Sequence, residues 1–453
     1  MAVPERTLGA LKLHVRESLI ARTVQLPIQK FIHTQGVSSA FLLAAAVAAL
    51  IWANSPWSAS YYHAWHIELT LSGLRLPIHA WINDAMMALF FFLVGMEIKQ
   101  EIVRGELQDL RRAALPICGG LGGMIVPALI YAAINHGGSG AHGWGVPMAT
   151  DIAFSLGVLT LVKGVPSELK IFLLSLAIAD DIGAIAVIAV FYSTELHLEY
   201  LLIGALILAV ILLCRRLGLG RQILYALLGF GFWLAILRSG IHATIAGVIL
   251  GFLMPVNAGV SLNEFSELGN EMIGEFRQAQ ATGDKARASR VLGAMEYLLQ
   301  KTEAPADRVT RNLHDWIAFL VLPLFALSNA GVTFSFTSLG AMLRSPVAWG
   351  VLIGLFLGKP LGVVGVSWIA VKTNLARLPN SVSWAHITGV GVLAGIGFTV
   401  SLFISALAFD DSLQLDSAKT AILIASLLAG VAGYLLLTRA GQTESEAQDA
   451  ARH

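Results

Sequence analysis

The stretch ELKIFLLSLAIADDIGAIAVIAVFY, residues 168–192, carries no charge between Lys170 and Glu195 other than the adjacent pair Asp180 and Asp181. It exceeds the roughly 20 apolar residues that cross a bilayer core, so the pair is expected near the hydrocarbon midplane. A charge there costs about 2.5–3.5 kcal/mol on insertion scales. Two neighbouring carboxylates also repel each other. The pair therefore predicts a positively charged partner, which is a proton, a metal ion or a lysine side chain.

The composition of the whole chain agrees with a membrane setting. Of its 453 residues, 56% are hydrophobic and 13% are charged, whereas soluble domains are about 25% charged. Apolar stretches near spanning length recur along the chain. They predict an all-α polytopic membrane protein with about twelve transmembrane helices, at 38–54, 81–103, 113–135, 145–162, 168–193, 198–214, 222–237, 240–255, 312–335, 346–371, 386–408 and 418–438.

The placement of Lys and Arg predicts the orientation, because cytoplasmic loops carry an excess of basic residues. With the N-terminus inside, the outer loops hold only Arg75, Arg238, Arg344 and Lys419 of the chain's 30 Lys and Arg. Both termini are therefore predicted to be cytoplasmic. The first 36 residues have no uninterrupted apolar core of the kind a signal peptide has. The expected domains are a cytoplasmic segment 1–37, a transporter domain 38–438 and a cytoplasmic tail 439–453.

Two polar insertions interrupt the spans. Residues 66–79 alternate apolar and polar side chains around a Ser-Gly pair, which predicts a small external β-hairpin. Residues 258–305 show apolar residues at helical spacing on both sides of an ATGDK turn, which predicts a cytoplasmic helical hairpin. This loop is interpreted as a lid or solvated insert, with a regulatory domain as the alternative. Cys118 and Cys214 lack ligand spacing and are expected to be packing residues. The net charge of +1 gives no indication of nucleic-acid binding.

Two predicted spans contain helix-breaking residues. Pro147, Thr150 and Asp151 lie within the fourth span, and Gly391, Gly395 and Gly397 lie within the eleventh. These spans are the middle members of the triplets 3–5 and 10–12, and paired interruptions of this kind indicate a transporter built of inverted-topology repeats. The alternative is ordinary close packing by small residues, which we prefer for Gly119, Gly123, Gly358 and Gly362.

Other intramembrane polar groups complete the candidate site. Lys359 is the only basic residue inside the tenth span, and a carboxylate partner is expected for it among Asp180, Asp181 and Asp151. A purely structural ion pair is the alternative. Glu97 and Glu101 lie at the inner end of the second span, where a solvated helix end competes with a cation-attracting vestibule. For His242 and Asp84, at span ends, capping or packing is as good an explanation as function.

Several motifs together resemble the NhaA family of Na+/H+ antiporters. They are WINDAMMALFFFLVGMEIK from Trp81, ATDIAFSLGVL from Ala149, LAIADDIGAIAVIAVFY from Leu176, SGIHATIAGV from Ser239, GKPLG from Gly358 and GIGFTVSLFI from Gly395. They occur in the family's order over residues 38–438, apart from the inner loop. Inverted repeats are already described for this family, so the repeat is not an independent finding.

The resemblance implies a role for each matching residue. Asp180 and Asp181 match the aspartate pair that binds the cation and carries the exchanged protons. Thr150 and Asp151 match the broken fourth helix, and Lys359 matches a lysine that pairs with the first aspartate. Gly395 and Gly397 match the unwound part of the eleventh helix. The positions linked to pH response match Glu97, Glu101 and His242.

The resemblance further implies an electrogenic, pH-regulated antiporter that exports Na+ or Li+ for external protons and has no cofactor. It would reside in the bacterial inner membrane as a homodimer formed through the 66–79 hairpin. Two features depart from the family: the inner loop is longer, and Thr310 stands roughly where relatives place an acidic residue. Both concern the region linked to pH response, so the pH profile is not carried over.

Proteins of other classes also place carboxylates in a membrane. An intramembrane aspartyl protease needs aspartates on different helices, whereas Asp180 and Asp181 are neighbours on one helix and point about 100° apart. A cation channel, or a symporter of an organic anion held by Lys359, is the other alternative. Na+-driven pH changes in proteoliposomes distinguish an antiporter from these.

Overall fold

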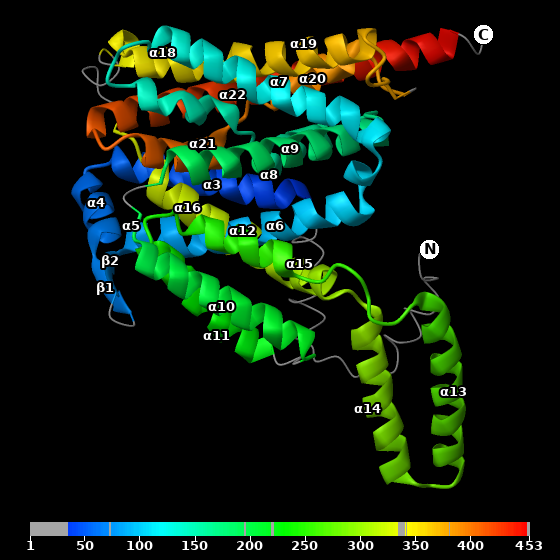
Figure 1. Ribbon diagram of the computed structural model, residues 1–453. Coiled ribbons are helices and arrows are strands. Elements are labelled where there is room, and N and C mark those ends of the chain that lie inside the picture. Colours follow the sequence, from blue (N-terminus) through cyan, green and yellow to red (C-terminus); the bar gives the residue numbers. More distant parts are fainter. Residues whose placement is uncertain are drawn as a thin grey trace.

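The computed structural model describes residues 35–71, 74–193, 196–218, 222–333, 340, 342–379 and 381–450. Of the predicted segment 1–37, residues 1–34 lie outside the described part of the chain. Most of the helices run side by side in one bundle (Figure 1). The first half of the chain forms α3 (Gln35–Ala53), α4 (Ser58–His66), α5 (Ile78–Trp81), η2 (Ile82–Met86), α6 (Met87–Arg104), η3 (Glu106–Gln108), α7 (Leu110–Ile134), η4 (Ala141–Met148), α8 (Ile152–Leu161), α9 (Ser167–Phe191) and α10 (Leu198–Arg216).

The second half continues the bundle and adds a projecting pair of helices. It forms α11 (Gln222–Arg238), α12 (Thr244–Leu253), α13 (Leu262–Ala281), α14 (Lys285–Thr302), α15 (Pro305–Trp316), η5 (Ile317–Val321), α16 (Leu322–Asn329), α18 (Pro346–Ile353), η6 (Gly354–Gly358), α19 (Lys359–Lys372), α20 (Trp384–Leu393), α21 (Phe398–Ala408) and α22 (Ser412–Ala450). Each of the twelve predicted spans overlaps one or more of these helices.

The number of membrane crossings follows less directly from the helices. Within the described residues, seven helices are long and apolar enough to cross a bilayer, or nine if each of two bent pairs counts as one span. Two shorter apolar helices, α11 and α12, are additional. One bent pair, α3 with α4, turns by 115°, and α4 lies across one end of the bundle (Figure 1). The fold is therefore a multi-pass helical membrane protein.

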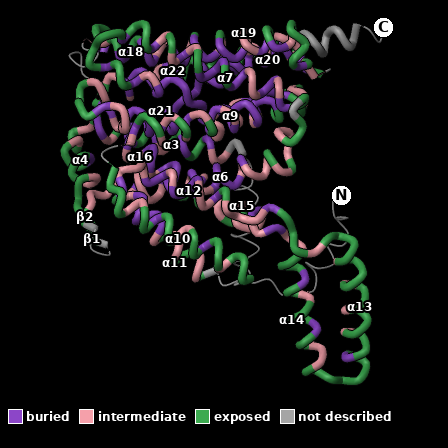
Figure 2. Tube along the Cα trace, in the orientation of Figure 1, coloured by how far each residue is buried: buried purple, intermediate pink, exposed green. Residues whose placement is uncertain are grey.

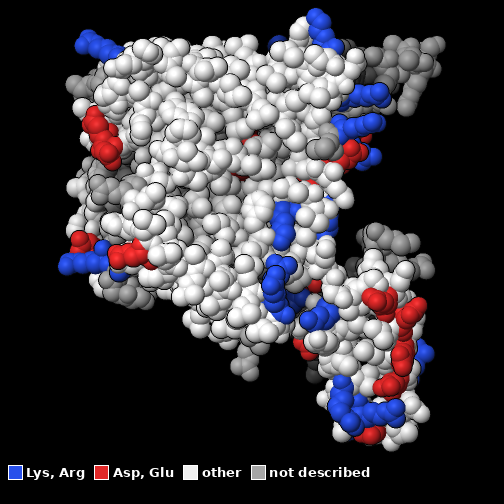
Figure 3. All heavy atoms as spheres, in the orientation of Figure 1, with Lys and Arg blue, Asp and Glu red and all other residues white. Residues whose placement is uncertain are grey.

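The surface of the bundle matches a lipid environment. Large aliphatic side chains point outward along the helices, as Leu129, Leu206 and Leu427 do at 64%, 67% and 67% exposure. The interior is also apolar, and the buried residues gather toward the middle of the bundle (Figure 2). On the face seen in Figure 3, charged side chains lie mainly toward the two ends and leave a white belt between them. This belt is the part that lipid would cover.

Both hairpins predicted for the polar insertions are present. Strands β1 (Glu68–Leu71) and β2 (Leu74–Pro77) pair antiparallel, with Glu68 opposite Pro77. Helices α13 and α14 form the predicted helical hairpin, turning at Gly283 with φ +67°. The two hairpins lie at opposite ends of the bundle (Figure 1). Cys118 and Cys214 are free.

The glycines assigned to close packing do bring helices together. A Cβ on Gly362 of α19 would lie 2.0 Å from the carbonyl oxygen of Gly122 on α7, so the two backbones touch. Cβ atoms on Gly119 and Gly358 would lie 3.0 Å from Ser367 Oγ and Pro127 Cα. Packing at this crossing sets how deeply α19, with Lys359 at its first position, enters the bundle.

Gly362→Val is expected to lower the thermal stability of the purified protein. The side chain has no space at the contact with Gly122, and overpacking of this kind costs about 1–3 kcal/mol. The control is Gly365→Val in the same helix, where a Cβ would meet nothing within 4 Å. Equal melting temperatures of the two variants in detergent would contradict the close contact.

Candidate functional site

The two spans predicted to be interrupted are both broken, and their breaks meet in the interior of the bundle. The first leaves helical geometry between Met148 and Ile152, directly after Pro147, which cannot donate a backbone hydrogen bond. The second breaks between Leu393 and Phe398 with a bend of 46°. The breaks are bonded to each other, because the Asp151 amide donates to the Ile396 carbonyl at 2.7 Å.

Asp151 joins the starts of both following half-helices. Its Oδ1 accepts from the Phe154 amide at 3.0 Å and caps α8. Its Oδ2 accepts from the Thr399 amide at 3.1 Å and from the Thr399 hydroxyl at 2.6 Å, in the first turn of α21. Helix N-termini carry unpaired amides and partial positive charge, which a carboxylate stabilises. Asp151 is therefore held by the two helix starts, and Lys359 pairs elsewhere.

Lys359 pairs with Asp180. Its Nζ donates to Asp180 Oδ2, and both side chains are fully buried. Thr150 Oγ1, in the first break, lies 2.6 Å from the same carboxylate oxygen and 2.9 Å from the Ala394 carbonyl in the second break. The Thr150 hydroxyl has one proton to give, so it can serve only one of these acceptors at a time. Asp180 is thus tied both to α19 and to the helix crossing.

The position of Lys359 follows from the local sequence. Pro360 has no N–H to donate to the preceding turn, and the helix widens to π geometry over Gly354–Gly358 immediately before Lys359. Glycines then leave room around the pair. A Cβ on Gly123 would lie 3.6 Å from Lys359 Nζ, and one on Gly120 would lie 3.5 Å from Asp180 Oδ1.

Gly395 and Gly397 let the second break approach this helix closely. A Cβ on Gly395 would lie 2.5 Å from the Leu355 carbonyl oxygen, and one on Gly397 would lie 2.9 Å from the Leu355 side chain. Any larger residue would push the break away from η6. These glycines therefore fix the distance between the crossing and the helix that carries Lys359.

Carboxylate oxygens remain available beside the crossing. Asp180 Oδ1 is buried and has no hydrogen-bond partner among the described residues. Asp181 is 3% exposed, and the same part of the chain offers its carboxylate no hydrogen bond or ion pair. Buried carboxylate oxygens without donors are unstable unless a cation or a proton joins them. The donor set, which is all oxygen, fits a hard cation such as Na+.

The remaining predicted residues lie at the two ends of the site. Glu97 and Glu101 are on α6 toward its C-terminal end, where Glu101 Oε2 accepts from the Glu106 amide at 3.0 Å. Glu101 also lines an open hollow of about 450 Å³ that reaches the side of α9. The other residues around this hollow are Arg104, Gly105, Glu106, Gln108, Asp109, Arg112, Ile171, Leu174 and Ser175.

His242 and Asp84 lie together near the start of α6. His242 Nε2 is 3.7 Å from Asp84 Oδ1, and Nδ1 is 2.8 Å from Thr244 Oγ1. The His242 ring meets the edge of Phe403 with centroids 5.1 Å apart. His242 therefore joins η2, α12 and α21, a packing arrangement that the sequence left open beside the pH role. The site does not bring His242 into contact with Asp180.

The sequence missed several polar residues that hold the crossing together. Thr399 and Ser401 of α21 bond Asp151 and the Val146 carbonyl, the latter at 2.8 Å. Ser155 of α8 donates to the Leu393 carbonyl at 3.0 Å. The signal was present, since each hydroxyl lies within four residues of a predicted break. Ser and Thr are common in membrane helices, so residue type alone did not distinguish these three from the other Ser and Thr residues of the predicted spans.

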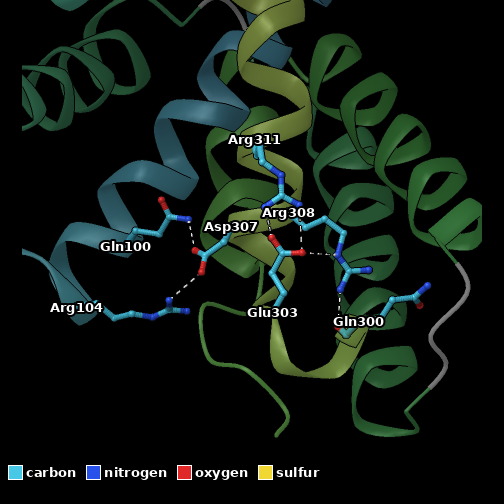
Figure 4. Close-up of polar contacts among 7 residues, drawn as sticks. All are labelled: Gln100, Arg104, Gln300, Glu303, Asp307, Arg308 and Arg311. Atoms are coloured by element: carbon cyan, nitrogen blue, oxygen red, sulfur yellow. Dashed lines mark hydrogen bonds and ion pairs between the residues drawn. The ribbon is translucent and has the colours of Figure 1, made fainter. Parts of the chain in front are cut away.

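A second polar cluster lies at the root of the α13–α14 hairpin (Figure 4). Asp307 of α15 accepts from Gln100 and Arg104 of α6, both at 3.0 Å. Glu303 pairs with Arg311 and with Arg308, the latter at 3.4 Å. Thr310, at the departure from the family pattern, has a buried hydroxyl without a partner among the described residues. The cluster joins the hairpin to the C-terminal end of α6.

The ion pairs of this cluster are expected to respond to salt rather than to physiological pH. The hydrogen bond from Arg311 holds the pKa of Glu303 below its usual range. A depressed carboxyl pKa stabilises the folded state above the ordinary value of about 4.3, and that stabilisation is lost as the pH falls through the lower value. Near neutral pH the pair stays ionised, whereas added salt screens exposed charges.

A buried carboxylate pair, a lysine and two crossed half-helices inside a multi-pass helical bundle define a membrane transporter. Comparison with known proteins specifies which kind. The profile of the family described as Na+/H+ antiporter 1 matches residues 29–437, and the chain belongs to that family.

Curated relatives match over nearly the whole chain. "Na(+)/H(+) antiporter NhaA 2" of Syntrophotalea carbinolica is 45% identical over 422 residues, covering 91% of this chain and 96% of the relative. "Na(+)/H(+) antiporter NhaA" of Oleidesulfovibrio alaskensis is 44% identical, covering 91% and 93%. The protein of the same name from Koribacter versatilis is 42% identical, covering 91% of both chains.

Proposed function

We propose that this protein exchanges Na+ or Li+ for protons at Asp180 and Asp181 by alternating access, and that it extrudes the cation. Membership of the antiporter family supports the exchange. The observation that carries the site is a carboxylate pair beside two bonded helix breaks, in which Asp180 Oδ1 and the Asp181 carboxylate have no hydrogen-bond partner among the described residues. The proposal includes twelve crossings, cytoplasmic termini, the inner membrane, and a homodimer formed through β1 and β2.

Exchange follows from competition for the same oxygens. Open to the inside, the site binds Na+ as Asp180 and Asp181 release protons. Open to the outside, protons displace the cation. An empty site with two negative charges is too costly to carry across the low-dielectric core, so the site changes sides only when it is occupied. Two carboxylates can release two protons for one Na+, which makes the exchange electrogenic.

Lys359 relieves the charge of Asp180 after the protons have been released and while no cation is bound. In the structure Lys359 Nζ donates to Asp180 Oδ2, the oxygen that Thr150 also approaches. Cation binding weakens this pair, and the loss of the cation restores it. Lys359 is fully buried and engaged with Asp180, so it is poorly placed to hold an organic anion. This arrangement favours an antiporter over a symporter.

The inner hollow provides the approach to the site. It lies between the inner end of α6 and the side of α9, about one and a half helical turns before Asp180 at Ser175. Glu101, Glu106 and Asp109 at its rim attract cations from the inner solution. The rim also carries Arg104 and Arg112, so its field is mixed rather than uniformly negative.

The test is transport by the purified protein in proteoliposomes with an internal pH dye. A Na+ gradient is expected to drive a pH change without any organic solute, and a K+ diffusion potential in the presence of valinomycin should alter its rate. A pH change that requires an organic anion would favour the symporter. Exchange that does not respond to the potential would contradict electrogenic transport.

Removing the hairpin residues 260–300 is expected to leave exchange in place. The ends of this segment already meet, because the amides of Gly259 and Val260 donate to the Lys301 carbonyl at 2.9 and 3.2 Å. Joining Gly259 to Lys301 therefore keeps the root cluster around Asp307. Antiport measured across pH, with the full-length protein as control, tests this. Complete loss of exchange in a folded variant would show that the hairpin takes part in transport.

A further inference from the structure

The α13–α14 hairpin is electrically polarised. Helix α14 has a single glutamate, Glu296, against the basic residues Lys285, Arg287, Arg290 and Lys301. Helix α13 has a single basic residue, Arg277, against a stripe of glutamates at spacings of three and four residues, at Glu264, Glu267, Glu271 and Glu275. Figure 3 shows acidic side chains along α13 and basic ones at the tip of the hairpin. Two helices of one hairpin therefore present opposite charges.

The hairpin lies parallel to the expected membrane plane. In Figure 1 its helices run across the direction of the bundle helices, and α14 is on the side nearer the bundle. Its root is at the level of the basic inner end of α10: Arg215 Nη1 donates to the Leu253 carbonyl at 2.9 Å, and the Ala306 amide donates to the Pro255 carbonyl at 3.0 Å. Beyond the root, the hairpin extends past the edge of the bundle (Figure 1).

The side of α14 that faces away from α13 has an interfacial composition. Val291 and Leu298, seven residues apart, are buried at 6% and 5% exposure and mark the side that packs on α13. The opposite half carries Lys285, Glu296 and two exposed apolar residues, Leu292 at 52% and Tyr297 at 63%, and Arg290 and Lys301 lie at its edge. Lys301 Nζ lies 5.4 Å from the centroid of the Tyr297 ring. Tyr and basic residues are enriched where a helix lies at a membrane surface.

We propose that α14 binds the anionic phospholipid surface of the inner leaflet. Its lysine and arginine side chains contact phosphate headgroups, while Leu292 and Tyr297 enter the headgroup region. The glutamates of α13 then face the cytoplasm, away from lipid of like charge. The complementary charge selects this occupant, since a negative surface attracts the +3 charge of α14 and repels the −3 charge of α13.

The experiment measures the distance of each helix from lipid in the full-length protein. Cys118 and Cys214 are replaced by Ala, and a bimane label is attached at Ser289→Cys on the outer side of α14 or at Glu271→Cys on the acidic stripe. The protein is placed in nanodiscs of phosphatidylcholine, with or without phosphatidylglycerol, that contain a headgroup nitroxide lipid. We expect several times stronger quenching at position 289 than at position 271, only with the anionic lipid, and its loss in high salt.

Charge variants provide the matched control. The triple change Lys285→Gln, Arg287→Gln and Arg290→Gln should abolish the quenching at position 289, whereas Glu264→Gln, Glu267→Gln and Glu275→Gln should leave it intact. Equal quenching at the two label positions, or none in anionic membranes, overturns the proposal. Quenching that depends on protein density rather than on lipid charge would indicate a second copy of the chain instead. If a triple variant fails to fold, the labelled protein without these changes still tests the proposal, because its quenching is compared between the two lipid compositions.

Discussion

Asp181→Asn is expected to reduce Na+/H+ exchange to the level of vesicles without protein, while the variant still inserts and folds. Asparagine keeps the size of the side chain but removes the charge that a cation or a proton must neutralise. Asp181 is 3% exposed and forms no ion pair with the described residues. Its charge therefore has little structural use, and its loss should cost activity rather than stability.

The measurement compares dye-detected exchange with the amount and melting temperature of the purified protein. Glu168→Gln is the matched control, because it makes the same kind of change at the exposed start of the same helix. That variant should exchange like the unaltered protein. Full exchange by Asp181→Asn would remove this carboxylate from the proposed mechanism.

Lys359→Met should have the largest effect on stability. It leaves the Asp180 carboxylate fully buried without its positive partner, and breaking a buried ion pair costs about 3–5 kcal/mol. Methionine fills nearly the same space, so lost packing contributes little. A marked drop in melting temperature in detergent is the expected result, together with weaker cation coupling.

The double variant Lys359→Met with Asp180→Asn separates stability from transport. A buried pair replaced by neutral groups of similar volume is often as stable as the original, and the amide introduced by the second change would retain Thr150 as a hydrogen-bond partner. We expect the melting temperature to recover while exchange does not. If Lys359→Met alone melted like the unaltered protein, the pair would not be part of the resting structure.

The helix breaks illustrate what can be predicted from sequence. Pro147 and the glycines of the eleventh predicted span act on their own backbone, so the two interruptions could be placed without knowing the fold. The helical hairpin could also be predicted, because the spacing of its apolar residues and its turn are local features of the sequence. The number of crossings was not, since α11 and α12 are shorter than the length that identifies a span.

The partner of Lys359 could not be chosen from the sequence. Asp151, Asp180 and Asp181 were all candidates, because each lies within an apolar stretch predicted to span the membrane. The structure commits Asp151 to the amides of two half-helices, and leaves Asp180 to Lys359. The roles of Glu97, Glu101 and His242 in pH response remain predictions, and the structure places them at the ends of the site.

The sequence by itself determined that this chain is a membrane protein, where its helices break, and that carboxylates lie in the middle of an apolar helix. These properties depend on hydrophobicity and backbone chemistry, which act within one helix. Only the tertiary structure decided which charges meet. Asp180 and Lys359 are 179 residues apart. They are brought together because α7 packs on α19 at Gly122 and Gly362 and on α9 at Gly120. Such contacts depend on how distant surfaces pack, and no local pattern in the sequence encodes them.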